Sequence, residues 1–121
     1  MRSLQTLWIF AITCAASLPL HADVPEIITA TANRTGSGWN FNVTLRHGDE
    51  GWDHYADGWG VYDLDGTALG YRVLAHPHVN EQPFTRSLSG VVIPERITQV
   101  VIRPHDLVHG DGLDYILELK Q

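Results

Sequence analysis

The feature of this sequence that most restricts its fold is a strict alternation of apolar and polar residues. From position 39 to position 45 every second residue is apolar, and the residues between them are Asn or Thr; the apolar set is Trp39, Phe41, Val43 and Leu45. Successive side chains of a strand point to opposite faces of a sheet. The pattern therefore predicts a strand with one buried face and one solvated face.

Shorter patterns of the same kind recur along the chain and are separated by turn signals. A glycine-rich turn at 34–38 joins the first two alternating segments, and Leu64-Asp65-Gly66-Thr67 has the Asp-Gly signal of a hairpin. No segment has a convincing helical period. The predicted strands are 28–32, 39–45, one that begins at 59–61, 69–73, 84–88, 97–103 and 113–119. Seven short strands predict an all-β fold, a seven-stranded sandwich of two sheets.

The residues before the first strand form a different kind of segment. A basic start at Arg2 precedes an apolar run from Leu7 to Leu20, and Leu20-His21-Ala22 resembles a cleavage site. We predict a signal peptide at 1–22 and a β-sandwich domain at 23–121, found in the periplasm or secreted and free of the membrane after cleavage. A membrane anchor is the alternative, but a spanning helix needs about 20 apolar residues. Thr13 argues against a lipid on Cys14.

Two resemblances bear on the fold and on export. The stretch from Thr85 to Arg103, with Leu88, Gly90, Pro94 and Val100-Val101-Ile102, resembles the late strands of fibronectin type III domains. This resemblance implies an immunoglobulin-like or fibronectin type III-like sandwich, although the Tyr expected in the sixth strand is absent. The segment 52–66 and the stretch from His76-Pro77-His78 to Arg86 are similar to an uncharacterised group of small exported bacterial proteins, and that likeness implies no chemistry.

Composition excludes several classes of function. Cleavage after Ala22 would remove the only Cys and the only Met, leaving 7 basic residues against 14 acidic ones. A domain without Cys has no disulfide and no thiolate metal site. Since the domain is acidic and has no basic cluster, we expect no nucleic-acid partner.

The positions of the histidines are the strongest functional signal in the sequence. They fall in pairs between predicted strands two and three, four and five, and six and seven; the six are His47, His54, His76, His78, His105 and His109. If each connection reverses the chain direction, these three loops emerge at one end of the sandwich. We therefore expect all six imidazoles at that end, and none at the opposite end.

This arrangement favours a site for a divalent transition metal. Imidazole is the commonest metal ligand, and the extended His76-Pro77-His78 presents two rings on one side, so we take them as the core pair. His105 or His109 would complete the site, and His47 or His54 is a further candidate. Imidazole with carboxylate suits Zn²⁺ or Cu²⁺. The carboxylates that could bind or orient the rings are Asp49, Glu50, Asp53, Asp57, Glu81, Asp106 and Asp111.

Other interpretations stay open. Exposed Trp52 and Tyr55 would suit a module that binds a glycan or a protein partner. Asp49, Glu50, Asp53 and Asp57 could instead bind Ca²⁺, although their spacing fits no EF-hand.

We expect no enzyme, because Ser87 and Ser89 lack a nucleophile elbow. The alternative is metal-assisted hydrolysis with Glu81 as the base. Trp59 should lie in the core. Arg86 shares strand parity with core residues and should pair with Asp57 or Asp63.

Overall fold

A computed structural model describes residues 24–120 as an all-β domain, and within this range the chain has no helix. It therefore has no helix there of the length and apolarity that a membrane span requires. The strands are β1 (Glu26–Thr35), β2 (Gly38–Arg46), β3 (Ala56–Tyr62), β4 (Ala68–Val73), β5 (Phe84–Val91), β6 (Gln99–Asp106), β7 (Gly110–Asp111) and β8 (Tyr115–Glu118). The predicted signal peptide at 1–22 lies outside the described residues.

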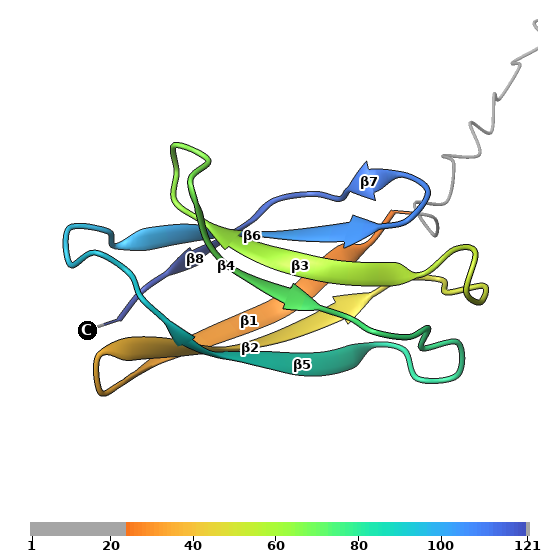
Figure 1. The fold of residues 1–121 in the computed structure, drawn as a ribbon, viewed down its shortest axis with the longest axis horizontal. Helices are drawn as coiled ribbons and strands as arrows, with labels where there is room; N and C mark the ends of the chain where they lie inside the picture. Colours follow the sequence, from red (N-terminus) through yellow and green to blue (C-terminus); the bar gives the residue numbers. More distant parts are fainter. Residues whose placement is uncertain (1–23, 121) are drawn as a thin grey trace, which may run out of the picture.

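The strands form two antiparallel sheets that face one another (Figure 1). The first sheet has the order β1-β2-β5, and the second has the order β4-β3-β6, with both β7 and β8 paired to β6. The predicted all-β sandwich is confirmed. The structure has eight strands within 24–120 rather than seven, because the two residues of β7 pair with the end of β6.

The core lies between the sheets and follows the alternation of the sequence. On β2, Phe41, Val43 and Leu45 are fully buried, and they meet apolar side chains of β3 and β6. Trp59 of β3 is also fully buried, which confirms its predicted place in the core. Burying one such large side chain contributes roughly 1.5–3 kcal/mol, so the facing rows of the two sheets hold the domain together without a disulfide.

The connections fall at two ends of the sandwich, as predicted. The β2–β3, β4–β5 and β6–β7 connections lie at the end drawn on the right in Figure 1. We call this the histidine end and define it by residues 47–55, 74–83 and 105–109. One prediction about it is wrong: His105 lies within β6 and not in a loop, because pairing with β3 and β7 continues the strand to Asp106.

The outer face of the second sheet contains two glycines that tyrosine side chains cover. A Cβ atom added to Gly58 would lie 2.3 Å from the phenol oxygen of Tyr71, and one added to Gly60 would lie 2.5 Å from the ring of Tyr62. Burial raises the pKa of Tyr71 to about 12, with a further contribution from the nearby carboxylate of Asp57. The phenol of Tyr71 is therefore neutral at physiological pH and packs on the backbone of β3.

Candidate metal centre

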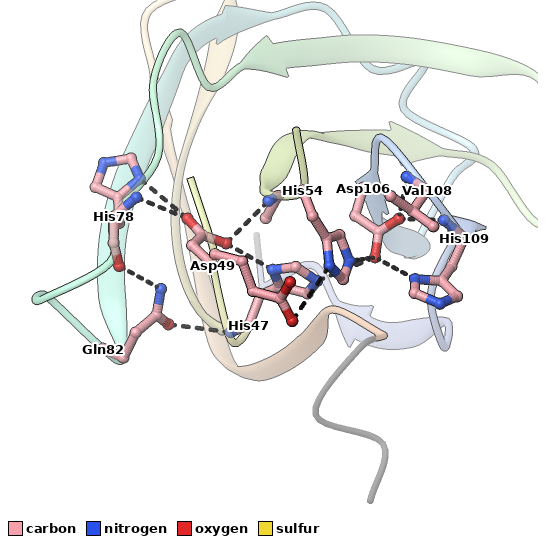
Figure 2. A network of polar contacts seen from close by, with 10 residues as sticks. His47, Asp49, His54, His78, Gln82, Asp106, Val108 and His109 are labelled. Carbon is pink, nitrogen blue, oxygen red and sulfur yellow. Dashed lines mark hydrogen bonds and ion pairs between the residues drawn. The ribbon is translucent and has the colours of Figure 1, made fainter. Parts of the chain in front are cut away.

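A single carboxylate oxygen is the meeting point of three imidazole rings at the histidine end (Figure 2). Asp106, the last residue of β6, is fully buried. Its Oδ2 lies 3.0 Å from His47 Nε2, 3.4 Å from His54 Nε2 and 3.1 Å from His109 Nδ1. The three histidines come from two different connections, so the fold and not a local motif brings them together.

The other oxygen of Asp106 fixes the turn that carries His109. Oδ1 accepts a hydrogen bond from the backbone N–H of Val108 at 2.9 Å and one from the backbone N–H of His109. Gly110 follows with a φ of +76°, a left-handed conformation that favours glycine. The chain therefore reverses sharply after β6, and the ring of His109 returns toward the carboxylate.

A second buried carboxylate, Asp49, holds the ring of His47 from the opposite side. His47 Nδ1 lies 2.6 Å from Asp49 Oδ1, which also accepts the backbone N–H of Ala56 at 3.0 Å. Asp49 Oδ2 accepts the backbone N–H of His78 at 2.7 Å. Gln82 adds a bridge between the same segments, since its Oε1 accepts from His47 N and its Nε2 donates to His78 O. These contacts direct His47 Nε2 toward Asp106.

The hydrogen atoms available do not match this arrangement. Both ring nitrogens of His47 face carboxylate oxygens, but a neutral imidazole has only one N–H. Three ring nitrogens also crowd Asp106 Oδ2, although a carboxylate oxygen has about two lone pairs. An extra proton on His47 would supply the missing N–H only, whereas a metal ion bound among these atoms would remove both mismatches, because coordination replaces the hydrogen bonds.

The electrostatics of Asp106 suit either cation. Burial pushes the pKa of the Asp106 carboxyl upward, but hydrogen bonds from His109 and His54 and from the backbone N–H of Val108 outweigh it. The net result is a pKa below the ordinary value of 3.8. Asp106 is therefore a carboxylate at neutral pH and can serve as an anionic ligand.

The distances from the imidazole nitrogens to Asp106 Oδ2 are close to the ligand separations around a small transition-metal ion. One donor atom each from His47, His54 and Asp106 lies within 4.8 Å of the other two, and all three residues are buried. Ligand atoms placed about 2.0–2.1 Å from Zn²⁺ at tetrahedral corners are about 3.3 Å apart. The separations of 3.0–3.4 Å around Asp106 Oδ2 are close to that value.

His76 and His78, the pair expected to form the core of a site, do not join this group. Their ring centroids are 4.5 Å apart, but the ring of His78 stacks on Phe84 at 3.9 Å. Arg86 donates to His78 Nε2 at 3.0 Å, and the guanidinium places a positive charge where a metal would bind. Burial, followed by the charge of Arg86, lowers the pKa of His78. The ring is therefore neutral and serves to pack the β4–β5 connection.

His105 is separated from the group by its place on β6. Its Nδ1 lies 2.5 Å from Asp57 Oδ1, and its strand neighbours direct it to the outer face of the second sheet. Because Asp49 binds His47 and Asp57 binds His105, the carboxylates proposed for Ca²⁺ are divided between different partners. Over 24–120, His47, His54 and Asp106 are the residues that assemble as a possible metal group.

Two further predictions concerned the same end of the molecule. The predicted partners of Arg86 were wrong, since its NH1 lies 3.5 Å from Glu81 and neither Asp57 nor Asp63 is its partner in the ion pair. Trp52 is exposed and Tyr55 is half-buried, with the two rings edge to face at 5.9 Å.

Strand parity distinguishes Asp106 from the other candidate carboxylates of the histidine end. Val100, Ile102 and Pro104 are buried at alternate positions of β6, and Asp106 continues their parity. An acid at the end of an inward-facing row needs buried partners, and the histidines of the adjacent loops are the partners that the fold supplies.

Comparison with known proteins gives one relative. A protein of Halomicrobium mukohataei, described as a "putative lipoprotein", is 45% identical over 92 residues. The aligned region is 76% of this chain but 44% of the relative, so this chain spans less than half of that protein. No family model and no solved structure matches the chain. The fibronectin type III resemblance therefore stays a prediction.

Proposed function

We propose that this protein is an exported β-sandwich that binds a divalent transition metal, Zn²⁺ or Cu²⁺, at its histidine end. The ligands of the proposed centre are His47 Nε2, His54 Nε2 and Asp106 Oδ2. The observation that carries the proposal is the convergence of imidazole nitrogens on one buried carboxylate oxygen at 3.0–3.4 Å. Its role would be capture, buffering or delivery of the ion.

The surroundings of these ligands favour metal over a purely structural network. Metal-bound histidines usually donate their other ring N–H to a carboxylate, which fixes the tautomer and the ring orientation. Asp49 meets His47 Nδ1 in this way at 2.6 Å, and Glu50 lies 3.8 Å from His54 Nδ1. The domain contains no Cys or Met after the predicted cleavage point, and nitrogen and oxygen ligands suit Zn²⁺ or Cu²⁺ rather than Cu⁺.

The test is metal binding by the tag-free protein, measured by calorimetry and by elemental analysis. We expect one ion per chain, and loss of tight binding in the double variant H47A/H54A. The matched control is H76A/H78A, which removes two histidines of the same end and should keep the ion. A dissociation constant above about 10 μM for both Zn²⁺ and Cu²⁺ would be weaker than that of sensor-range sites. The proposal would then be wrong.

Export is the second part of the proposal. The apolar segment before Asp23 and the description of the relative as a lipoprotein support it. Intact mass of protein from the native host decides how the chain is processed: a chain that begins at Asp23 indicates a cleaved signal peptide. A lipid-modified chain that begins at Cys14 would show a membrane-anchored protein, and a retained Met1 would contradict export by cleavage.

A further inference from the structure

His109 lies on the same carboxylate oxygen as the proposed ligands but differs from them in exposure. Its Nδ1 is 3.1 Å from Asp106 Oδ2, and its ring centroid is 5.1 Å from that of His54. The side chains of His47 and Asp106 are fully buried and that of His54 is 10% exposed, whereas that of His109 is 36% exposed. Among these four residues, solvent reaches the centre mainly through His109.

The backbone of His109 is fixed although its ring is exposed. The backbone N–H groups of Val108 and His109 both donate to Asp106 Oδ1, and Leu107 N donates to Tyr55 O at 3.3 Å. The turn at 107–109 is thus tied to β6 and to the β2–β3 connection. Rotation about the side-chain bonds of His109 can therefore move the ring away from Asp106 without unfolding the turn, and exposed rings make such rotations on the ps–ns timescale.

The other ligands have no comparable freedom. Asp49 holds His47 Nδ1, and the carboxylate of Asp106 is fixed by two backbone N–H groups on one oxygen. His54 is buried between His47 and His109, with ring centroids 4.8 and 5.1 Å away. Displacing any of these three would disturb buried hydrogen bonds or packing, which is costly.

We propose that His109 is the fourth ligand of the metal centre and the one that exchanges, so that the ion enters and leaves as its ring swings outward. This inference rests on the proposed function. Three buried ligands hold the ion, and the exposed fourth closes the tetrahedron. The centre is then built for reversible loading, as a protein that buffers or delivers metal requires, rather than for a permanent structural ion.

Release of Zn²⁺ into an excess of a chromophoric chelator tests this. We expect H109A to keep one ion per chain but to release it about tenfold faster or more, with weaker affinity, since losing a ligand opens the centre. The control is H105A, because its side chain is also 36% exposed and also bound to a carboxylate, but on the outer face of the sheet. H105A should release Zn²⁺ at the wild-type rate.

The outcomes separate this inference from the proposed function. If wild type binds Zn²⁺ and H109A releases it at the wild-type rate, His109 is not a ligand, although the three-ligand proposal stands. If wild type binds no metal, both proposals fail. H109Q provides a second variant that keeps a polar side chain in the turn, and it should also release faster; matching melting curves of the metal-free variants exclude misfolding as the cause.

Discussion

Asp49 determines how His47 faces the proposed centre. One of its oxygens meets His47 Nδ1 and the backbone of Ala56, and the other accepts the backbone N–H of His78. In D49N an uncharged amide replaces the carboxylate. Its NH₂ group is a donor, so it cannot accept the hydrogen bonds that one carboxylate oxygen of Asp49 accepts. Loss of such an orienting partner typically weakens metal affinity by about 10–100-fold.

We therefore expect D49N to bind Zn²⁺ in the same stoichiometry with an affinity about 10–100-fold lower, as measured by competition with a chelator of known affinity. The control is D65N, because Asp65 is exposed in the β3–β4 turn away from the histidine end. An unchanged affinity in D49N would show that Asp49 supports only the loop and not the ligand.

His78 predicts a pH dependence of the metal-free protein. Its pKa lies below the ordinary 6.5 because burial disfavours the charged ring, and Arg86 and His76 add to this effect. The unfolded chain therefore takes up a proton near pH 6.5 that the folded chain does not. Stability should fall as the pH drops below about 6.5.

Urea unfolding between pH 7 and 5, with chelator in every sample, measures this slope. H78Q should lose less stability than wild type over that range, because Gln cannot take up the proton in the unfolded state. The control is D65N, because Asp65 is exposed in the β3–β4 turn away from His78, and this variant should keep the wild-type slope. If the free energy of unfolding changed equally with pH in H78Q and wild type, His78 would not be the source of the pH dependence.

At the scale of strands, the packing of Tyr71 and Tyr62 on β3 requires glycine at positions 58 and 60. In G58A the new Cβ would lie 2.3 Å from the Tyr71 oxygen, so Tyr71 must leave its place on the strand. Overpacking of this kind costs about 1–3 kcal/mol. A double-mutant cycle of G58A with Y71A, measured by urea unfolding, should show strong coupling between the two positions. In the Y71A background the phenol is absent, so G58A should leave the free energy of unfolding unchanged or raise it. The reason is that Ala is preferred to Gly in a strand by about 0.5–1 kcal/mol. Additive effects would show that Tyr71 does not depend on Gly58.

The alternation of the sequence was sufficient to predict the strands but not their ends. Positions 39–45 gave β2 correctly, because burial of one face is a local pattern. β7 was missed since Gly110-Asp111 has no apolar residue and pairs only because β6 continues past Pro104 to Asp106. The same continuation moved His105 from a predicted loop onto a strand.

The gathering of histidines at one end was also predictable, since the direction of the strands determines it. The grouping within that end was not. Arg86 separates His78 from any cation, and this contact joins β5 to the β4–β5 connection in a way that spacing along the chain does not reveal. The sandwich type and the metal itself stay predictions.

At the scale of the whole molecule, the proposed ion would join the two sheets. His47 follows β2 of the first sheet and Asp106 ends β6 of the second. An ion that binds only the folded chain stabilises it, by about 2.7 kcal/mol at a concentration 100 times its dissociation constant. For a domain of this size that corresponds to a rise in melting temperature of roughly 10–20 °C.

Calorimetric melting with and without Zn²⁺ measures this rise. D106A should lose this rise, because the carboxylate that His47, His54 and His109 share is gone, whereas H105A should retain it. A rise in D106A equal to that of wild type would place the ion elsewhere on the protein.

Lys120 is the single lysine of the sequence, and it is exposed. It follows β8, in which Glu118 pairs with Gln99 at the start of β6, so it lies at the end of the sandwich opposite the histidine end. Apart from the amino terminus, amine-reactive chemistry therefore has one point of attachment. A solid support coupled through that side chain would carry the molecules in a common orientation, with the histidine end turned toward the liquid. If the proposed centre binds metal, the domain could then serve as an oriented sorbent for trace metal, and its capacity per coupled molecule would report how many centres are accessible.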